Sequence, residues 1–340
     1  MVGGKLTIED SGAIRLELDG TLPRDAQSKP ITEKFAQAAT RNIQGLLTNA
    51  GHVLLLNAIC NGTTFRTHNL SHESYFVQQC LVGEEAFKRD GKSPLRFRAL
   101  GVDLDGFEEW LWLTAIEVDR RKNRLVAKYK SPKDRVYQLP FATMKLEYDL
   151  SGPYFAKSRY NKLKIRQIAR IKIQQNGKMS LEECQSHFQN IEELLILLTS
   201  SDYNLGWPKV YPVGGRQRAT LYYSRHRSEA KAPRAHECLI NFPAIADSFG
   251  DLLTAYVEKR ELYGPGIYMY LGTRRGAKMF VEHRFVNLIW GLEAFDRHGR
   301  SRDEVSKPLN EKVIRILKQI SSKEDCRWVT AHGVGLSRRD

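Results

Sequence analysis

The chain has 340 residues, and 53 Lys and Arg residues against 39 Asp and Glu residues give it a formal net charge of +14. This length predicts roughly two domains, and a hydrophobic content of 41% excludes a disordered chain. No apolar run approaches the roughly 20 residues that span a bilayer, and the N-terminus lacks the apolar core of a signal peptide. We therefore expect a globular protein that does not contact a membrane.

The cysteines favour a reducing compartment. They are five in number, far apart, and never arranged as Cys-x-x-Cys: Cys60, Cys80, Cys184, Cys238 and Cys326. An odd, dispersed set argues against a disulfide framework and against a zinc ribbon. The sequence thus predicts a cytoplasmic protein.

The positive charge is concentrated in the second half. Residues 1–150 hold 21 basic and 19 acidic residues, whereas residues 151–340 hold 32 and 20. Residues 150–181 contain eight basic residues and no acidic one, and residues 207–236 contain seven basic residues and one acidic one. This asymmetry is typical of a protein with a polyanionic partner, either nucleic acid or an anionic surface. The alternative is a surface that only keeps the protein soluble.

The N-terminal part predicts β-structure. Residues 6–8 and 14–18 alternate apolar and polar side chains around Ser11-Gly12, which indicates a hairpin. Strands are also predicted over 53–59, 75–82, 95–102 and 124–129. Residues 107–113 predict a short helix whose aromatic side is covered by a sheet. Together these short elements indicate a β-rich domain over residues 1–150.

In residues 162–173, apolar and basic side chains alternate almost without interruption, which predicts a further strand. Five of its six even positions are basic and would face water or a ligand: Lys162, Lys164, Arg166, Arg170 and Lys172. As a nucleic-acid surface they would make roughly three to five phosphate contacts, with salt-dependent and sequence-independent binding. The alternatives are a solvated sheet face or a sheet edge protected by lysines.

Helices follow. Ser180 and Glu183 form a capping-box pattern in front of an apolar stripe that ends at Leu198. A second helix is predicted over 244–262, a strand-like bridge over 267–271, a third helix over 278–298 with its apolar side in a core, and a fourth over 303–320. The fold class is therefore α+β, with a β-rich N-terminal region followed by helices.

Several classes of site are not indicated. The chain lacks the P-loop, the dinucleotide-binding glycine motif, the H-E-x-x-H zinc motif and the G-x-S-x-G nucleophile motif, so no cofactor is expected. His68 and His72 have metal-ligand spacing, but no Cys or carboxylate cluster accompanies them, so no metal site is expected. Acidic residues gather between Asp103 and Glu109, where a solvated turn before a helix explains them better than a catalytic pair.

The segment Glu282-His-Arg-Phe-Val-Asn-Leu-Ile-Trp-Gly-Leu-Glu-Ala-Phe-Asp-Arg-His298 resembles a helix of the ApeA-type bacterial anti-phage proteins. Other stretches resemble the same family in the same order. They are residues 3–7 with 14–20, 43–47 with 53–57, 104–111 and 180–199. The resemblance covers essentially the whole chain, although each motif by itself is weak.

The resemblance implies a β-rich sensor or regulatory region followed by a helical HEPN domain that cleaves RNA in abortive infection. HEPN ribonucleases work without metal through an R-x4–6-H motif. The His moves a proton near the ribose 2′-OH, and the Arg stabilises charge on the phosphate. The implied partners are RNA such as tRNA, a phage component as trigger, and a second copy bound through the helical domain.

The chain departs from the family in its last part. Its one R-x4-H segment joins Arg327 to His332, which would lie about 140° apart on an ideal helix, and Gly333 and Gly335 follow. Family members continue to a later motif. We therefore expect three regions: a β-rich domain over 1–150, the completion of the N-terminal region over 151–265, and an incomplete HEPN-like domain over 266–340. The alternative is a non-enzymatic module that binds nucleic acid or a partner protein.

Overall fold

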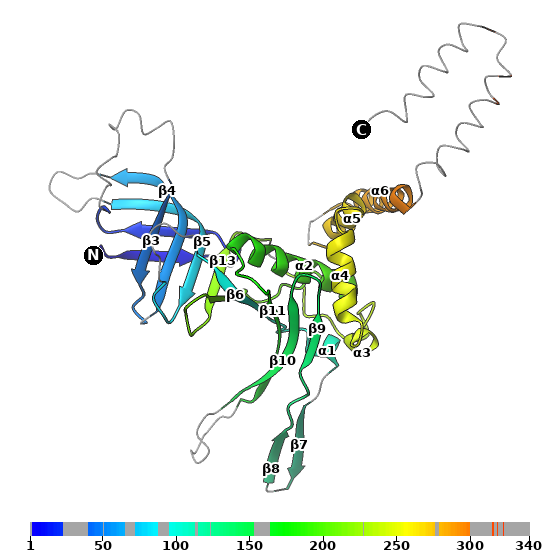
Figure 1. Cartoon of the computed structure of the whole chain (residues 1–340), viewed down its shortest axis with the longest axis horizontal. Coiled ribbons are helices and arrows are strands. Elements are labelled where there is room, and N and C mark those ends of the chain that lie inside the picture. The colour runs from blue at the N-terminus through cyan, green and yellow to red at the C-terminus, as the bar shows by residue number, and fades with distance from the viewer. Residues whose placement is uncertain are drawn as a thin grey trace. The chain divides into compact units, whose positions relative to one another are not determined.

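The structure is a computed structural model that describes residues 2–22, 40–49, 51–64, 72–87, 95–112, 115–122, 124–152, 164–226, 228–275 and 279–299, together with 315, 318 and 322. The chain divides into two compact units, residues 1–256 and 257–340. The α+β class is confirmed, because strands dominate the first unit and helices follow them (Figure 1).

Eleven strands of the described part form one antiparallel sheet. Its neighbours follow the order β1-β2-β5-β13-β12-β6-β11-β10-β9, and β4 joins β5 while β3 joins β4. The strands are β1 (Gly4–Ile8), β2 (Ile14–Leu18), β3 (Arg41–Leu46), β4 (His52–Thr64), β5 (His72–Gly83), β6 (Phe97–Asp103), β9 (Arg135–Gln138), β10 (Thr143–Ser151), β11 (Arg166–Gln174), β12 (Lys209–Pro212) and β13 (Ala219–Tyr223).

Strand β5 joins the N-terminal strands β1 to β4 to the rest of the sheet, which begins with β13. Along one edge it pairs with β4, and along the other it pairs first with β2 and then with β13. The predicted hairpin between β1 and β2 is confirmed, and Gly12 occupies its turn with φ of 78°. The expected domain boundary near residue 150 falls inside the sheet, since β10 and β11 are paired from Thr143–Gln174 to Ser151–Arg166.

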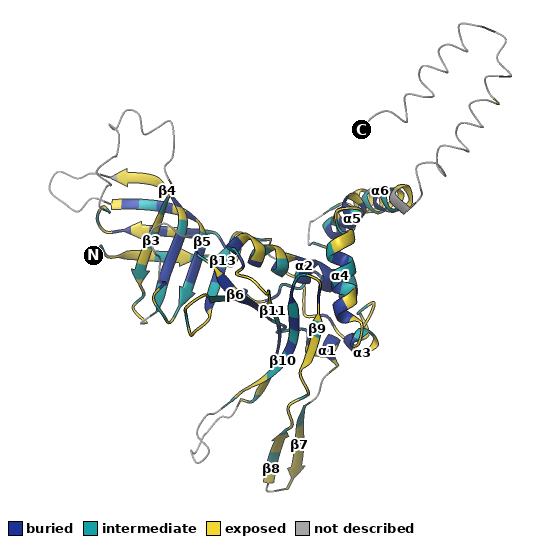
Figure 2. Ribbon diagram, viewed as in Figure 1, coloured by how far each residue is buried: buried dark blue, intermediate teal, exposed yellow. Residues whose placement is uncertain are grey.

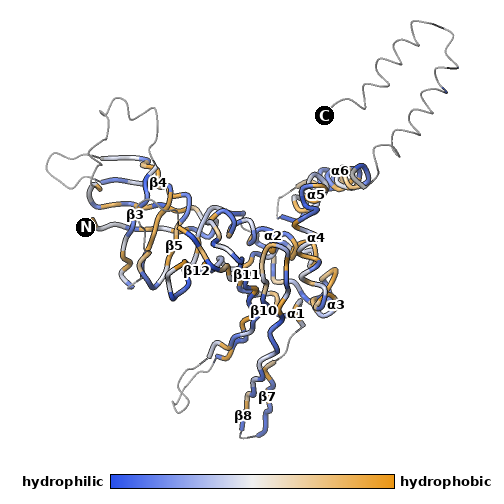
Figure 3. Tube along the Cα trace, viewed as in Figure 1, coloured by the Kyte–Doolittle hydropathy of each residue, from blue (hydrophilic) through white to orange (hydrophobic). Residues whose placement is uncertain are grey.

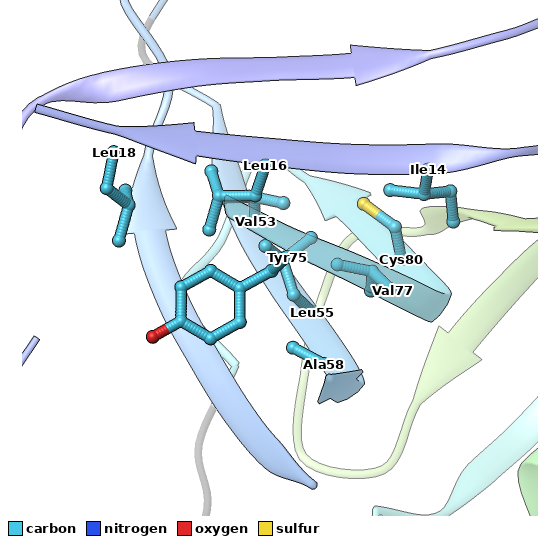
Figure 4. Packing of buried hydrophobic residues seen from close by; sticks show 9 residues of the cluster. All are labelled: Ile14, Leu16, Leu18, Val53, Leu55, Ala58, Tyr75, Val77 and Cys80. Atoms are coloured by element: carbon cyan, nitrogen blue, oxygen red, sulfur yellow. The ribbon is translucent and has the colours of Figure 1, made fainter. Parts of the chain in front are cut away.

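An apolar core lies between the N-terminal strands. It is built from alternating side chains of β2, β4 and β5, and Figure 4 shows them pointing toward one another: Ile14, Leu16, Leu18, Val53, Leu55, Ala58, Tyr75, Val77 and Cys80. The alternation follows the strand period of two in β2 and at the start of the β4 and β5 sets, and it shifts by one residue before Ala58 and Cys80. Burial of these side chains removes apolar surface from water and fixes the strand register.

Helix α2 (Leu181–Thr199) packs on the sheet beside β6 and β13. Its predicted capping box is confirmed, because Ser180 Oγ accepts from the Glu183 backbone and Glu183 accepts from the Ser180 backbone. Phe188 meets Tyr223 edge to face at 6.5 Å between ring centroids. The apolar side of α2 is buried, as Figure 2 shows by its dark blue segments.

The short helix predicted near residue 107 is α1 (Glu108–Leu111). Its Trp110 is buried and contacts aromatic rings of two helices. The indole lies 5.4 Å from the ring of Phe242 in α3 (Phe242–Ile245) and 6.1 Å from Phe249 in α4 (Phe249–Lys259). The indole N–H donates to the Ile240 carbonyl at 2.9 Å, which satisfies its one donor.

The continuous helix predicted over 244–262 is wrong, since α3 and α4 are separate. The hydroxyl of Tyr137 in β9 donates to the Ala246 carbonyl at 2.6 Å. In a continuous helix, that carbonyl would accept from the backbone N–H of Gly250. The side-chain hydrogen bond therefore accompanies the break, and it ties the helices to the sheet.

The second unit contains α5 (Gly264–Arg274) and α6 (Val281–Gly299). The strand predicted over 267–271 is wrong, because Pro265 lies in the first turn of α5, where proline favours the start of a helix. The third predicted helix is confirmed as α6, but only part of its apolar side is covered, where Phe295 packs near Gly266 of α5. Phe285 and Leu292 are 64% and 65% exposed. The fourth predicted helix lies almost entirely outside the described residues.

Strands β7 (Ile116–Arg121) and β8 (Arg124–Tyr129) form a separate two-stranded ribbon. Their register runs from Ile116 opposite Tyr129 to Arg121 opposite Arg124. We call this pair of strands, with the residues that follow it to 133, the β7–β8 ribbon. Most of its residues are exposed, as the yellow colouring in Figure 2 shows.

Candidate nucleic-acid interface

The basic residues predicted to bind nucleic acid belong to β11 and the segment before it. Lys162 lies outside the described residues, and Lys164 is exposed two residues before the strand begins. Within β11, Arg166, Arg170 and Lys172 share one face of the sheet because they are two or four residues apart. The structure thus places three of the five predicted residues on one face of the sheet, with Ile168 between Arg166 and Arg170.

Arg170 does not face water. It is 7% exposed, and its Nε donates to Asp103 of β6, which lies directly opposite it in the strand pairing. Its Nη1 is 3.6 Å from Glu147 of β10 on the other side. Burial lowers the pKa of Arg170, but the hydrogen bond and charge of Asp103 outweigh burial, so the pKa is raised overall. The expectation that this even-numbered position faces water is therefore wrong.

Arg166 has carboxylates on neighbouring segments. Its guanidinium is 2.9 Å from Asp105 and 3.7 Å from Glu108, and its side chain remains 43% exposed. Burial raises the pKa of Asp105, and the charge of Arg166 opposes that shift. The acidic turn around residue 105 is therefore a set of partners for β11 and is not merely a solvated helix start. Sequence reasoning missed this because the two segments are far apart in the chain.

Lys172 and Lys209 extend the same face toward β12 and β13. The Lys172 ammonium lies 5.0 Å from the ring centroid of Tyr211. The Lys209 ammonium donates to Thr220 Oγ1 at 2.8 Å, and burial lowers its pKa while Asp103 opposes that shift. In the described part of the chain, neither Lys164 nor Lys172 has a carboxylate within ion-pair distance.

The second basic stretch, residues 207–236, is also partly internal. It contains β12 and β13, and Arg225 follows directly after them. The Arg225 guanidinium stacks 4.1 Å from the Trp207 ring centroid, lies 3.8 Å from Glu192 and donates to the Leu205 carbonyl at 2.7 Å. Burial lowers the pKa of Arg225, and Glu192 opposes that shift. This cation therefore supports the fold and does not offer charge to a ligand.

The predicted basic residues therefore fall into two groups, internal ion-paired cations and cations that remain accessible to solvent. Arg170 is paired with carboxylates of β6 and β10, and Arg225 is paired with Glu192 of α2. Lys164, Arg166 and Lys172 keep part of their surface in contact with solvent. Such a face offers about three phosphate contacts, the lower end of the range of three to five that the alternation predicted. Whether it binds nucleic acid stays a prediction.

The other predicted sites have less structural support. Arg327, His332 and His68 lie outside the described residues, and His72 is 3.5 Å from Asp19. Within the described ranges, no three side chains of His, Cys, Asp or Glu come close enough together to hold a metal ion. No helix in that same part of the chain is both long enough and apolar enough to cross a membrane.

Comparison with known proteins identifies a family. The model of the family "ApeA N-terminal domain 1" matches residues 1–256. Neither a curated protein nor a solved structure matches the chain. The matched range is three-quarters of the chain and ends at the same residue as the first compact unit. The chain therefore belongs to the ApeA N-terminal domain 1 family, which implies an ApeA-like defence protein.

Proposed function

We propose that residues 1–256 form the sensor and regulatory region of an ApeA-like anti-phage protein, and that residues 257–340 belong to a HEPN-type helical part. The observation that carries this proposal is the coincidence of two boundaries. The family match ends at residue 256, and so does the compact unit that holds the large sheet. A region that folds as its own unit is suited to regulate a helical part that follows it.

The proposed reaction of the complete system is metal-independent RNA cleavage during abortive infection. In such a site a His moves a proton near neutral pH and an Arg stabilises charge on the phosphate. Arg327 and His332 are the candidate pair in this chain, but their i, i+5 spacing separates them on a regular helix. We therefore propose that this pair is not catalytic and that the HEPN-type part within this chain is incomplete. A cytoplasmic location is part of the proposal.

An RNA cleavage assay tests the chemistry. The purified chain is incubated with total RNA and with tRNA, in parallel with His332→Ala. We expect no cleavage by either protein. Cleavage by the unmodified chain that His332→Ala abolishes would overturn the incomplete domain, because it would identify His332 as catalytic.

A plating assay tests the defence role. Bacteria carry the gene either with its native downstream DNA or with a stop codon placed after codon 340, and both strains are challenged with the same panel of phages. We expect a reduced plating efficiency only with the downstream DNA present. Equal protection by both genes would contradict an incomplete helical part, and protection by neither against any phage would contradict the defence role.

We also propose that the helical part binds a second copy of the chain. One side of α6 carries an exposed stripe at helical spacing, made of Val281, Phe285, Ile289 and Leu292. Sedimentation velocity should show a dimer that Phe285→Glu with Leu292→Glu dissociates. The matched control is Arg297→Glu, at a position 75% exposed on the same helix. If the unmodified chain sediments as a monomer, the proposed dimer is contradicted.

The alternative function, a non-enzymatic module that binds nucleic acid, is favoured by the basic face of β11. Charge reversal at Lys164 and Lys172 tests it, because these two cations have no carboxylate partner in the described structure. Filter binding over a range of salt concentrations should show a steep negative slope that the double variant reduces. Absence of binding at low salt would eliminate this alternative for β11.

A further inference from the structure

The β7–β8 ribbon is separate from the large sheet and exposed along its length. Its two strands pair only with each other, and their middle residues are exposed apart from the half-buried Val126. A two-stranded hairpin is at best marginally stable by itself in water. A ribbon of this kind is therefore suited to gain its remaining contacts from a partner.

The ribbon carries the densest positive charge of the first unit. From residue 120 to residue 133 there are seven basic residues and no acidic one. All seven are exposed: Arg120, Arg121, Lys122, Arg124, Lys128, Lys130 and Lys133. The near-zero net charge of residues 1–150 does not reveal this cluster. The acidic residues that balance it lie elsewhere, several of them in the ion-pair network around β11.

The charge is least compensated at the end of the ribbon. Glu117 and Asp119 both lie on β7, and Arg121 is 3.4 Å from Asp119. Beyond Asp119, Arg120 and Arg124 lie on β7 and β8 with no carboxylate within ion-pair distance in the described structure. Figure 3 shows hydrophilic colouring over most of the ribbon.

One face of the ribbon also exposes aliphatic side chains. Val118 lies opposite Ala127, and Leu125 lies opposite Arg120, so all four share a face. Val118 is 61% exposed and Leu125 is 68% exposed. A partner must therefore present both repeated negative charge and an apolar surface within a few ångströms of it. The grooves of a nucleic-acid duplex do so, since phosphates border the edges of stacked bases.

We propose that the β7–β8 ribbon is a binding arm for double-stranded DNA. Paired strands lie about 4.8 Å apart, and a two-stranded ribbon with its side chains fits a B-form major groove about 12 Å wide. Ribbons also enter the minor groove, where apolar side chains insert between base pairs. The deep, narrow major groove of an RNA duplex does not admit such a ribbon. The Arg and Lys side chains contact phosphates, and Val118 and Leu125 contact bases or sugars.

This inference does not depend on RNA cleavage or on defence, because binding is measured on the purified full chain. Fluorescence anisotropy with a labelled DNA duplex of about 25 base pairs gives the dissociation constant at several salt concentrations. Each lost phosphate contact reduces the slope of log K against log[salt] by about 0.9. The triple variant Arg120→Gln, Arg121→Gln and Arg124→Gln should therefore reduce the slope by nearly 3 and weaken binding at least tenfold.

A matched control removes the same charge elsewhere. Lys5, Lys178 and Lys259 are exposed and lie outside the ribbon, so their replacement by Gln lowers the net charge equally. We expect this control to keep most of the affinity and slope. Equal losses in both triple variants would overturn the proposal, because they would assign binding to total charge. Circular dichroism and thermal melting establish that both variants are folded.

The choice of partner is tested with competitors. Leu125→Ser should weaken DNA binding several-fold without changing the salt slope, because it removes an apolar contact and no charge. The proposal is overturned by no DNA binding at 50 mM salt, by tighter binding to tRNA or an RNA duplex than to DNA, or by equal competition from poly-glutamate. Binding to vesicles rich in phosphatidylserine, without DNA binding, would also overturn it.

Discussion

Arg170 of β11 and Asp103 of β6 lie opposite each other in neighbouring strands and form a buried ion pair. Glu147 approaches the same guanidinium from β10, so one cation joins three strands. Removing the cation leaves two carboxylates close together and poorly solvated. Breaking a buried pair in this way costs about 3–5 kcal/mol. Arg170→Met should therefore lower the free energy of unfolding by that amount, as measured by urea denaturation.

The control for this substitution is Lys164→Met, two residues before the same strand. Lys164 is exposed and has no carboxylate partner in the described structure, so its replacement should change stability by less than about 0.5 kcal/mol. Similar losses in the two variants would show that the ion pair does not join the strands.

Gly250 in α4 lies against Tyr137 of β9. A Cβ atom on Gly250 would lie 2.7 Å from the Tyr137 Cβ, which no unstrained contact allows. Overpacking of this kind costs about 1–3 kcal/mol. Gly250→Ala should therefore lower the urea midpoint and separate α4 from the sheet. Gly177→Ala is the matched control, because a Cβ atom there meets no atom within 4 Å.

The sequence predicts local elements well where one pattern dominates. The alternation of residues 14–18 and the capping box at Ser180 and Glu183 correspond to β2 and to the start of α2. The prediction was wrong where a distant group decides the structure. Tyr137 takes the carbonyl of Ala246 at the junction of α3 and α4, and no local pattern encodes that contact.

The candidate site shows the same division. Alternation correctly places Arg166, Arg170 and Lys172 on one face, but it does not reveal which strands lie beside them. The pairing of β11 with β6 and β10 brings Asp103 and Glu147 to Arg170, and so converts a predicted ligand contact into an internal ion pair. The β7–β8 ribbon shows the reverse case, because its cations remain exposed. Its charge is visible in the sequence, but its exposure follows only from the fold.

His187 in α2 makes stability depend on pH. Its ring stacks on Phe141 at 5.3 Å between centroids, and its Nε2 lies 3.0 Å from the Gln175 amide nitrogen, a contact that requires a neutral Nε2. Burial lowers the pKa of His187 below its ordinary value of 6.5, and Glu183 opposes that shift only partly. The unfolded chain therefore binds the proton more readily, so stability is fully present above about pH 6.5 and is lost as the pH falls below it.

His187→Phe isolates this effect from the titration of carboxylates, because Phe keeps the stacking on Phe141 but cannot bind a proton. Between pH 7.5 and pH 5.5, the melting temperature of the unmodified protein should fall further than that of His187→Phe. Equal decreases in the two proteins would mean that protonation of His187 does not contribute to the acid sensitivity.

Thiol reactivity should separate the cysteines by burial. Cys80 and Cys184 are fully buried, and burial raises the pKa of each thiol to about 12, whereas Cys60 is exposed at the surface of β4. Because the thiolate is the reactive form, N-ethylmaleimide at pH 7.5 should modify Cys60 within minutes and leave Cys80 and Cys184 unmodified. Peptide mapping by mass spectrometry identifies the labelled sites, and 6 M guanidinium should make all three react. Labelling of Cys184 in the folded protein as fast as that of Cys60 would mean that α2 opens from the sheet on the timescale of the reaction.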